Sequence, residues 1–354
     1  MLTWRVRSRA VRWGDAWGVV VSVLLLFSAR LPAQPSRSTM PDSVRDYLSA
    51  AMVAFRTHSV HQADVDWRSL EDSVVARAAN AQTPAGTWAA LTWALRHVDA
   101  HSFLMPPERM MMASAGGMVP TAARPVASRP AGQLLDGGIA VVAVRPHSGR
   151  NRPAYVDSLQ SQIRALDSAG ACGWVVDLRE NTGGNMWPML AGVGPLLGAE
   201  VVGSMTNSPP GMGWHYRDGR SWSGGATPPA EPDGWGSAAP RRLSNTHGPV
   251  ALLVGRQTAS SGEITLLAFL GRPNVRSFGD STAGRNSANA SVPLRDGATL
   301  LVTSAYPRDR LGRRYPLSVG PDELVSLDDS AGGDAPLRRA VVWLRRQPSC
   351  TERR

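Results

Sequence analysis

The chain has 354 residues, enough for one large domain or two of ordinary size. Hydrophobic residues make up 43% and charged residues 19%, a balance that excludes a largely disordered chain. The formal net charge is +10, and all 38 basic residues are arginine. Because lysine is absent, mechanisms that need a lysine amine are excluded, namely a Schiff base, a Ser-Lys dyad and a P-loop. Arginine cannot take over as a base, since its guanidinium does not lose a proton in proteins.

The positive charge is distributed along the chain and predicts an arginine-rich surface. Residues 1–33 hold five arginines and one aspartate, which leaves +6 of the total for all the rest. No block of basic residues alternates with aromatic residues, as a single-strand nucleic-acid site would need. We therefore expect no nucleic-acid partner.

The N-terminal segment, residues 1–33, has the layout of a secretory signal peptide. Basic residues precede an apolar run of 14 residues, Ala16–Ala29, which is short against the ~20 that span a bilayer. The protein is therefore expected to be exported, as a periplasmic or secreted protein. The cleavage motif is weak because Leu31 is not a small residue, so an uncleaved membrane anchor is the alternative, and membrane contact is expected only in that case.

Two cysteines, Cys172 and Cys350, are present. Export would permit a disulfide between them. They lie far apart in the sequence, however, and Cys172 begins an apolar strand, which favours two unpaired thiols. The sequence does not predict an oligomeric state.

Residues 34–105 are expected to form a small helical subdomain after a short polar linker. Apolar residues recur there at helical spacing, and Asp42-Ser43 and Thr83-Pro84 are typical helix starts. Three helices are predicted, with their apolar positions at Val44, Leu48, Ala51, Met52 and Phe55, at Trp67, Leu70, Val74 and Val75, and at Trp88, Leu91 and Leu95.

Two segments lack periodicity. Residues 106–136 are rich in Met, Ala, Gly and Pro and are expected to form a linker or a mobile flap. Residues 203–248 are rich in Gly and Pro and contain Trp214, Trp222 and Trp235. The three indole rings could form a substrate platform, or they could pack against the main body, which is the commoner outcome.

Residues 137–346 alternate between strand and helix patterns, which is typical of an α/β layer around a buried sheet. Residues 347–354 form a C-terminal tail. The predicted strands are Ile139–Val144, Gly173–Leu178, Pro249–Val254, Val275–Phe278 and Ala298–Ala305, and the predicted helices are Pro153–Ala169, Met186–Leu197, Ser261–Leu270 and Pro336–Arg346.

The segment Thr258–Glu263, with the sequence Thr-Ala-Ser-Ser-Gly-Glu, lies between a predicted strand and an apolar helix. At such a turn the hydroxyl of Ser260 is exposed. The helix N-terminus supplies free N–H groups and a positive dipole end for a developing oxyanion. The alternative is a plain capping box, because Ser260 and Glu263 have the S-x-x-E spacing; taken alone, this pattern favours the capping box.

Two further segments carry residues suited to chemistry. Asp177–Gly184 ends a strand with a pair of glycines, which let the backbone approach a ligand closely, although a tight turn explains them equally well. Leu95–Ser102 contains His101, and histidine is the side chain best suited to act as a base near neutral pH. A single histidine is more often structural.

Taken together and in this order, these segments resemble the tail-specific, or C-terminal-processing, serine peptidases. The resemblance extends from about residue 40 to residue 346, and it is the combination of motifs that is specific. The matching motifs are Asp99–Ser102, Asp177–Gly184, Thr258–Glu263, Gly279–Gly284 and Gly320–Asp322, with Val65–Trp67 and Asp334–Leu337 as further landmarks.

The resemblance implies a crotonase-like fold, in which ββα units stack as a superhelix behind a helical N-terminal part. It implies that Ser260 is the nucleophile. It places the oxyanion hole at the N–H of Ser261 and at that of Gly183 or Gly184. In the tricorn-like branch of the family a histidine from the N-terminal segment is the base, and this histidine matches His101.

The chain departs from the family in four places. The branch that uses a lysine base has it at the position of Arg285, so that mechanism is excluded here. The serine that supports the histidine is replaced by Ala100, and the supporting glutamate falls near Tyr315–Pro316, where no acid is present. The candidates to replace that support are Asp99, Glu263 and Asp309. Residues 106–136 are also too few for the PDZ domain that many members carry.

The sequence thus predicts an exported serine peptidase that hydrolyses peptide or protein substrates through a Ser-His acyl-enzyme. No metal or cofactor is expected, because the seven histidines and two cysteines show no ligand spacing. The alternative is a family member that has lost catalysis and binds a ligand or a peptide. A third hypothesis, acyl-CoA chemistry, rests on the fold alone and agrees poorly with export.

Overall fold

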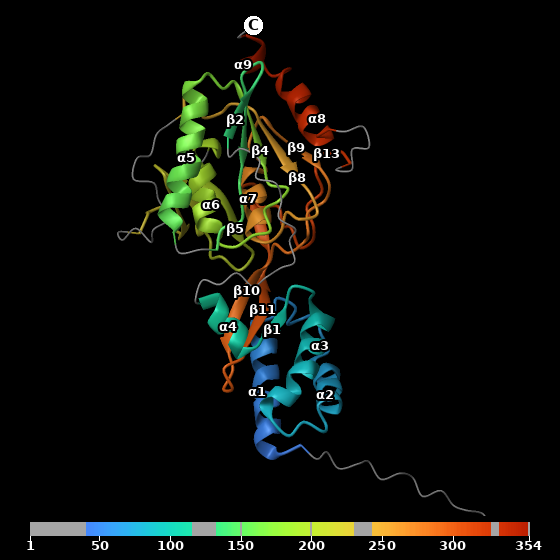
Figure 1. Cartoon of the computed structure of the whole chain (residues 1–354). Coiled ribbons are helices and arrows are strands. Elements are labelled where there is room, and N and C mark those ends of the chain that lie inside the picture. The colour runs from blue at the N-terminus through green and yellow to red at the C-terminus, as the bar shows by residue number, and fades with distance from the viewer. Residues whose placement is uncertain are drawn as a thin grey trace, which may run out of the picture. The chain divides into compact units, whose positions relative to one another are not determined.

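The computed structural model describes residues 40–114, 132–148, 151–198, 200–229, 243–326 and 333–352 (Figure 1). All of them belong to one compact unit. The predicted signal peptide and residues 115–131 of the predicted linker lie outside the described ranges. No helix within those ranges is long and apolar enough to cross a membrane.

The three helices predicted near the N-terminus are present. Each buries its apolar face in a common cluster, and Phe55 packs edge-on against Trp67 with ring centroids 5.1 Å apart. The second helix begins where the carboxylate of Asp66 accepts the N–H of Ser69, and the third follows a short 3-10 turn capped by Thr83. The helices are α1 (Asp42–His58), α2 (Trp67–Arg77), η1 (Pro84–Thr87) and α3 (Trp88–Val98).

A three-stranded antiparallel sheet completes this helical part. Its strand order is β1-β11-β10, formed by β1 (Phe103–Met105), β11 (Thr299–Ala305) and β10 (Ala288–Pro293). Leu300 and Val302 of β11 are fully buried in the same cluster as the helices. Strands from the segment predicted as peptidase core therefore complete the core of the helical part.

Part of the predicted linker, residues 106–136, has regular structure. Helix α4 (Pro107–Ser114) and strand β2 (Gly132–Leu135) lie within it. Strand β2 pairs antiparallel with β3 (Ile139–Ala143). The lack of periodicity in the sequence did not indicate these two elements; β2 gains the hydrogen bonds of a sheet edge, which its own sequence pattern does not reveal.

The main sheet has six strands in the order β13-β9-β8-β4-β3-β2, and the five other than β2 run parallel. Side chains alternate across it: Trp174 and Val176 face α5, α6 and α7, whereas Val175 faces α8. Both faces are covered, as is typical of a sheet whose central strands are parallel. The remaining bounds are β4 (Gly173–Asp177), β8 (Val250–Val254), β9 (Val275–Gly279), β13 (Glu323–Leu324), α5 (Arg152–Ser168), α6 (Met186–Val193), η2 (Gly194–Leu196), α7 (Ser261–Phe269), α8 (Ala335–Leu344) and α9 (Pro348–Thr351).

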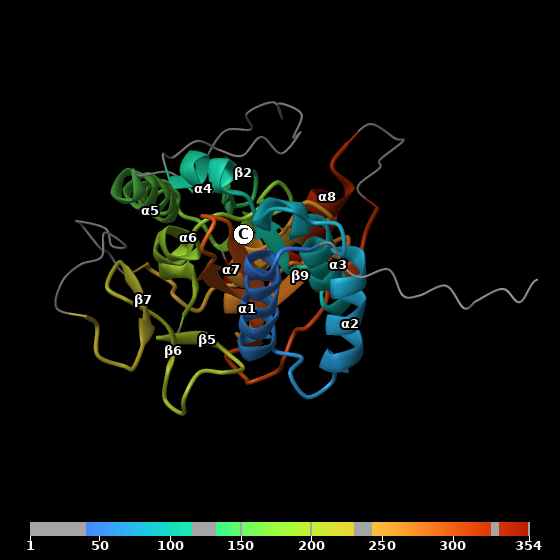
Figure 2. The same ribbon diagram turned by 90° about the horizontal axis from the view of Figure 1, so that it is seen from below.

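A second, four-stranded sheet occupies much of the segment expected to be aperiodic. It consists of β12 (Pro307–Asp309), β5 (Val201–Met205), β6 (Gly213–Arg217) and β7 (Arg220–Gly224), and Figure 2 shows the last three side by side. Trp214 and Trp222 are only 3% and 4% exposed. The packing alternative is therefore confirmed for these two rings, and Trp235 lies outside the described residues.

The two cysteines form a disulfide, so the preference for free thiols is wrong. The short helix α9 returns the chain to the start of β4, where Ser349 Oγ donates to the carbonyl of Cys172 at 2.9 Å. The Cα atoms of Cys172 and Cys350 lie 5.0 Å apart although 178 residues separate them. The prediction was wrong because separation in sequence does not imply separation in space, and the end of the chain here folds back onto the sheet.

The mixed α/β architecture predicted from the alternating pattern is present. The finer description, a crotonase-like superhelix of ββα units, stays a prediction from the family resemblance. In this fold the carboxyl ends of β4 and β8 lie next to each other, because these strands are paired and parallel. The segments that follow them, 178–184 and 255–260, are thereby brought together.

The disulfide is expected to stabilise the fold, because it closes a long loop in the unfolded chain. Reduction should lower the free energy of unfolding by about 2–4 kcal/mol. Thermal unfolding with and without dithiothreitol measures this. A Cys172→Ser/Cys350→Ser double variant should melt lower and be insensitive to the reductant; an oxidised protein whose melting temperature equals that of the double variant would contradict the prediction.

Candidate active site

Ser260 lies at the turn between strand β8 and helix α7, as the sequence predicted. Its φ is 52°, a positive value that few non-glycine residues adopt. In the capping box expected from the S-x-x-E spacing, Glu263 Oε2 accepts the N–H of Ser260 at 2.9 Å. The motif can therefore be both a capping box and a nucleophile turn, because the capping bond fixes the turn that carries the Ser260 hydroxyl.

The carboxylate of Glu263 joins a second segment to this turn. It is fully buried and also accepts the Thr282 hydroxyl at 2.6 Å, the Gly284 N–H at 2.8 Å and the Arg285 N–H at 2.7 Å. With the N–H of Ser260 it therefore has four donors. No contact joins it to the imidazole of His101 in the part of the chain described, so its observed role is to hold the backbone around Ser260.

The paired glycines lie against the serine turn. Gly183 and Gly184 have φ values of 104° and 117°, and a Cβ added at Gly183 would lie 2.8 Å from the Cβ of Ser260. Only glycine fits that approach. The two turns are also bonded directly, because Ser261 Oγ donates to the carbonyl of Gly184 at 2.7 Å.

The N–H groups predicted to bind an oxyanion differ in their partners. The N–H of Gly183 donates to Asn181 Oδ1 at 3.0 Å. The N–H groups of Gly184 and Ser261 have no acceptor among the residues described here. Gly184 is exposed, whereas Gly183 is buried. The pair of N–H groups without an acceptor in the described ranges is therefore that of Gly184, which is exposed, and Ser261, which is 8% exposed.

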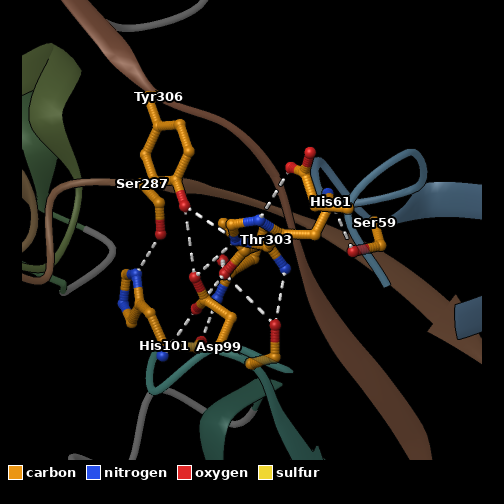
Figure 3. A network of polar contacts seen from close by, with 10 residues as sticks. Ser59, His61, Asp99, His101, Ser287, Thr303 and Tyr306 are labelled. Atoms are coloured by element: carbon orange, nitrogen blue, oxygen red, sulfur yellow. Dashed lines mark hydrogen bonds and ion pairs between the residues drawn. The ribbon is translucent and has the colours of Figure 1, made fainter. Parts of the chain in front are cut away.

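His101 lies in the loop between α3 and β1. Its Nδ1 contacts the hydroxyl of Ser287, and its backbone N–H donates to Asp99 Oδ1 at 2.8 Å (Figure 3). Burial lowers the pKa of its imidazole; the charge of Asp99 opposes this shift and the charge of Arg285 adds to it. The net lowered pKa favours the neutral imidazole, which is the form that can accept a proton.

Ser287 is a contact of the histidine that sequence reasoning missed. The family pattern places the residues that support the histidine at Ala100 and near Tyr315–Pro316. Within the described ranges, no hydrogen bond joins these residues to the imidazole of His101. Asp309 is bonded elsewhere, to Arg313 at 2.7 Å and to the Tyr315 hydroxyl at 2.9 Å. No sequence signal marks Ser287, since it meets His101 only through folding of chain segments 186 residues apart.

Among the described residues, no hydrogen bond joins the Asp99 carboxylate to the imidazole of His101 either. Its carboxylate accepts the Thr303 hydroxyl at 2.7 Å and lies 3.4 Å from His61 Nε2 and from the Tyr306 hydroxyl. Burial alone would raise the pKa of Asp99, but the hydrogen bonds from Thr303, the His101 N–H and His61 outweigh it, and the pKa is lowered. The carboxylate therefore stays ionised.

A shallow groove of about 540 Å³ borders the glycine turn and the start of α7. It offers a partly apolar surface beside Gly184 and Ser261, where a bound chain could lie. Its lining residues are Ser148, Gly184, Asn185, Met186, Trp187 and Ser261.

The predicted residues thus form two groups connected by one short segment. Ser260, Ser261 and the glycines meet at the ends of β4 and β8, whereas His101 comes from the helical part. Residues 284–287 connect the two groups. The backbone N–H groups of Gly284 and Arg285 donate to the carboxylate of Glu263, and the hydroxyl of Ser287 contacts His101. No hydrogen bond joins Ser260 to His101 in the described part of the chain.

Known proteins are similar to most of this chain. The nisin-resistance protein of Lactococcus lactis subsp. lactis is 28% identical over 316 residues, which cover 87% of this chain and 89% of that protein. A lipoprotein from Streptococcus agalactiae has a similar structure, with a TM-score of 0.62, 24% identity and coverage of 86% of this chain and 97% of that one. The photosystem II D1 C-terminal processing protease gives a TM-score of 0.54 at 16% identity, with coverage of 80% and 93%.

The two structural likenesses show a shared fold. The model of Peptidase family S41 matches residues 140–325, more than half of the chain, and includes both turns of the site. This match confirms the family that the motifs around Asp99, Asp177 and Thr258 indicated. The chain belongs to peptidase family S41, a family of serine peptidases.

Proposed function

We propose that this protein is an exported serine peptidase in which Ser260 attacks a peptide carbonyl and His101 accepts its proton. The observation that carries the proposal is the Ser260 turn. A serine with a positive φ starts a buried helix, and the Gly183–Gly184 turn lies against it. This arrangement supplies a hydroxyl and adjacent backbone N–H groups, the parts that acyl transfer needs.

In this proposal the N–H groups of Ser261 and Gly184 bind the oxyanion. Neither has an acceptor among the described residues, and Ser261 is the first residue of α7, where the helix dipole adds positive potential. Gly183 contributes through its shape, because its missing side chain lets the two turns approach. Its N–H is already bonded to Asn181 and orders the turn.

His101 takes the role of general base. Its Nδ1 faces the Ser287 hydroxyl, which leaves Nε2 to accept the proton of Ser260 Oγ. The proton then passes to the leaving amine, an acyl-enzyme remains, and water attacks it with the same imidazole as base. The Oγ–Nε2 hydrogen bond would form in the complex with substrate, since such contacts often tighten only there.

The relatives support a location at the cell envelope or outside the cell. One similar structure is of a lipoprotein, and a similar sequence is of a nisin-resistance protein. The disulfide agrees with an oxidising compartment. Export itself rests on the predicted signal peptide. We propose peptides as the substrate class, and the name of the relative makes nisin one substrate to test.

The first test is covalent labelling of the folded protein with a fluorophosphonate, together with peptide hydrolysis. We expect Ser260 to be labelled, and Ser260→Ala to lose both labelling and hydrolysis. A matched control, Ser291→Ala, removes an exposed hydroxyl on β10 and should behave as the wild type. No labelling of folded wild-type protein would overturn the proposal and favour a protein that binds ligands without cutting them.

The second test concerns the glycine turn. Gly183→Ala should lower kcat/KM by about 100-fold, because the new methyl group would displace Ser260 or the turn. Gly312→Ala is the control: its φ of 81° is also positive and unfavourable for alanine, but nothing lies within 4 Å of the added Cβ. Steady-state kinetics and melting temperatures of both variants separate loss of the site from strain. Equal activity of the two variants would contradict the assignment.

The third test is the pH dependence of kcat/KM. Because burial and Arg285 lower the pKa of His101, the acidic limb should lie below the pH expected for an ordinary imidazole, near 6.5. Arg285→Gln removes one lowering influence and should move the limb to higher pH. Arg295→Gln, an exposed arginine in the turn between β10 and β11, should leave it in place. A limb unmoved by Arg285→Gln would show that His101 is not the titrating base.

A further inference from the structure

Four polar side chains next to the proposed base are not used in the reaction as described so far. They are His61, Asp99, Thr303 and Tyr306, and Figure 3 shows them converging from different parts of the chain. His61 follows α1, Asp99 follows α3, and Thr303 lies on β11, with Tyr306 just beyond its end. The aspartate is their common partner.

The donor and acceptor roles within this cluster can be assigned. Tyr306 keeps its proton, because burial and the nearby Asp99 raise the pKa of its hydroxyl to about 12. Its oxygen lies 2.9 Å from His61 Nε2 and 3.4 Å from Asp99 Oδ2. His61 can therefore donate to the tyrosine oxygen while the tyrosine hydroxyl donates to the carboxylate.

The other oxygen of the same carboxylate holds the base. Asp99 Oδ1 accepts the backbone N–H of His101 at 2.8 Å and the Thr303 hydroxyl at 2.7 Å. The backbone carbonyl of His101 in turn accepts a hydrogen bond from Asn289 Nδ2 at 3.1 Å. The backbone of His101 is thus fixed at both ends, and its ring is fixed at Nδ1.

We propose that Asp99, Tyr306 and His61 are positioning residues, which set where His101 Nε2 stands relative to Ser260 without touching the substrate. This inference rests on the proposed function. The base belongs to the helical part and the nucleophile to the main sheet, so their separation depends on contacts that join these regions. The cluster acts within the helical part: it ties the α3–β1 loop, which carries His101, to the end of β11, and β11 continues into β12 of the second sheet.

The size of the expected effect follows from geometry. A misplacement of about 1 Å in a catalytic group can cost about 100-fold in rate. Tyr306→Phe removes one hydroxyl at the rim of the cluster and should lower kcat by about 10-fold with KM nearly unchanged. Asp99→Asn removes the shared carboxylate and should lower kcat further, and Asp99→Glu should restore part of the loss.

The matched control is Tyr47→Phe. Tyr47 is also a buried tyrosine of the helical part, and its hydroxyl donates to a carboxylate, Asp296 Oδ2, at 3.0 Å. It has no contact with His101 in the described structure. Both tyrosine variants should lose similar thermal stability, but only Tyr306→Phe should lose kcat.

Rates are measured per active site, counted by fluorophosphonate titration, so that unfolded protein does not lower them. In a double-mutant cycle, Tyr306→Phe and His61→Gln should be non-additive, because both act through Asp99. Active wild-type protein with kcat unchanged in Tyr306→Phe, or equal losses in Tyr306→Phe and Tyr47→Phe, would overturn the inference and leave the proposed function standing. Wild-type protein that neither labels nor hydrolyses peptides would overturn both.

Discussion

One buried carboxylate, that of Glu263, holds the site together. It accepts the backbone N–H of Ser260 and three donors from the segment 282–285, so the nucleophile turn and the chain leading to β10 meet at a single group. A buried carboxylate is costly unless its oxygens are well bonded, and here four donors surround it. The unfavourable φ of Ser260 persists because this anchor and the start of α7 fix the residues on both sides.

The site is assembled from two regions that are only partly independent. Strands β10 and β11 leave the main sheet region and join the helices, where Leu300 and Val302 are buried. Ser287, in the segment that precedes β10, contacts His101. Thr303 and Tyr306, near the end of β11, contact Asp99. The same hairpin therefore contributes to the helical core and to the surroundings of the base.

Local patterns predicted much of this architecture, and long-range contacts account for most of what they missed. Helical spacing located α1 to α3, and continuous apolar runs located β3, β4 and β8, because these elements bury whole faces or whole strands. Strands β5 to β7 and β10 alternate weakly and contain Gly, Ser and Asn, so their pairing is set by neighbours that no local pattern reveals. The motifs placed Ser260 beside Gly183 correctly. Ser287, Tyr306 and His61 were not predictable, because each reaches the base only through tertiary contact.

The disulfide has a consequence for how the protein matures. Cys172 and Cys350 are each only 4% exposed, so reductants reach the bond poorly once the chain has folded. In a reducing cytoplasm the thiols would remain free, and the last helix would lack its covalent tie to the start of β4. For an exported chain, the end of the protein would therefore be secured only after translocation. Oxidation would then make the folded form durable in the compartment where it works.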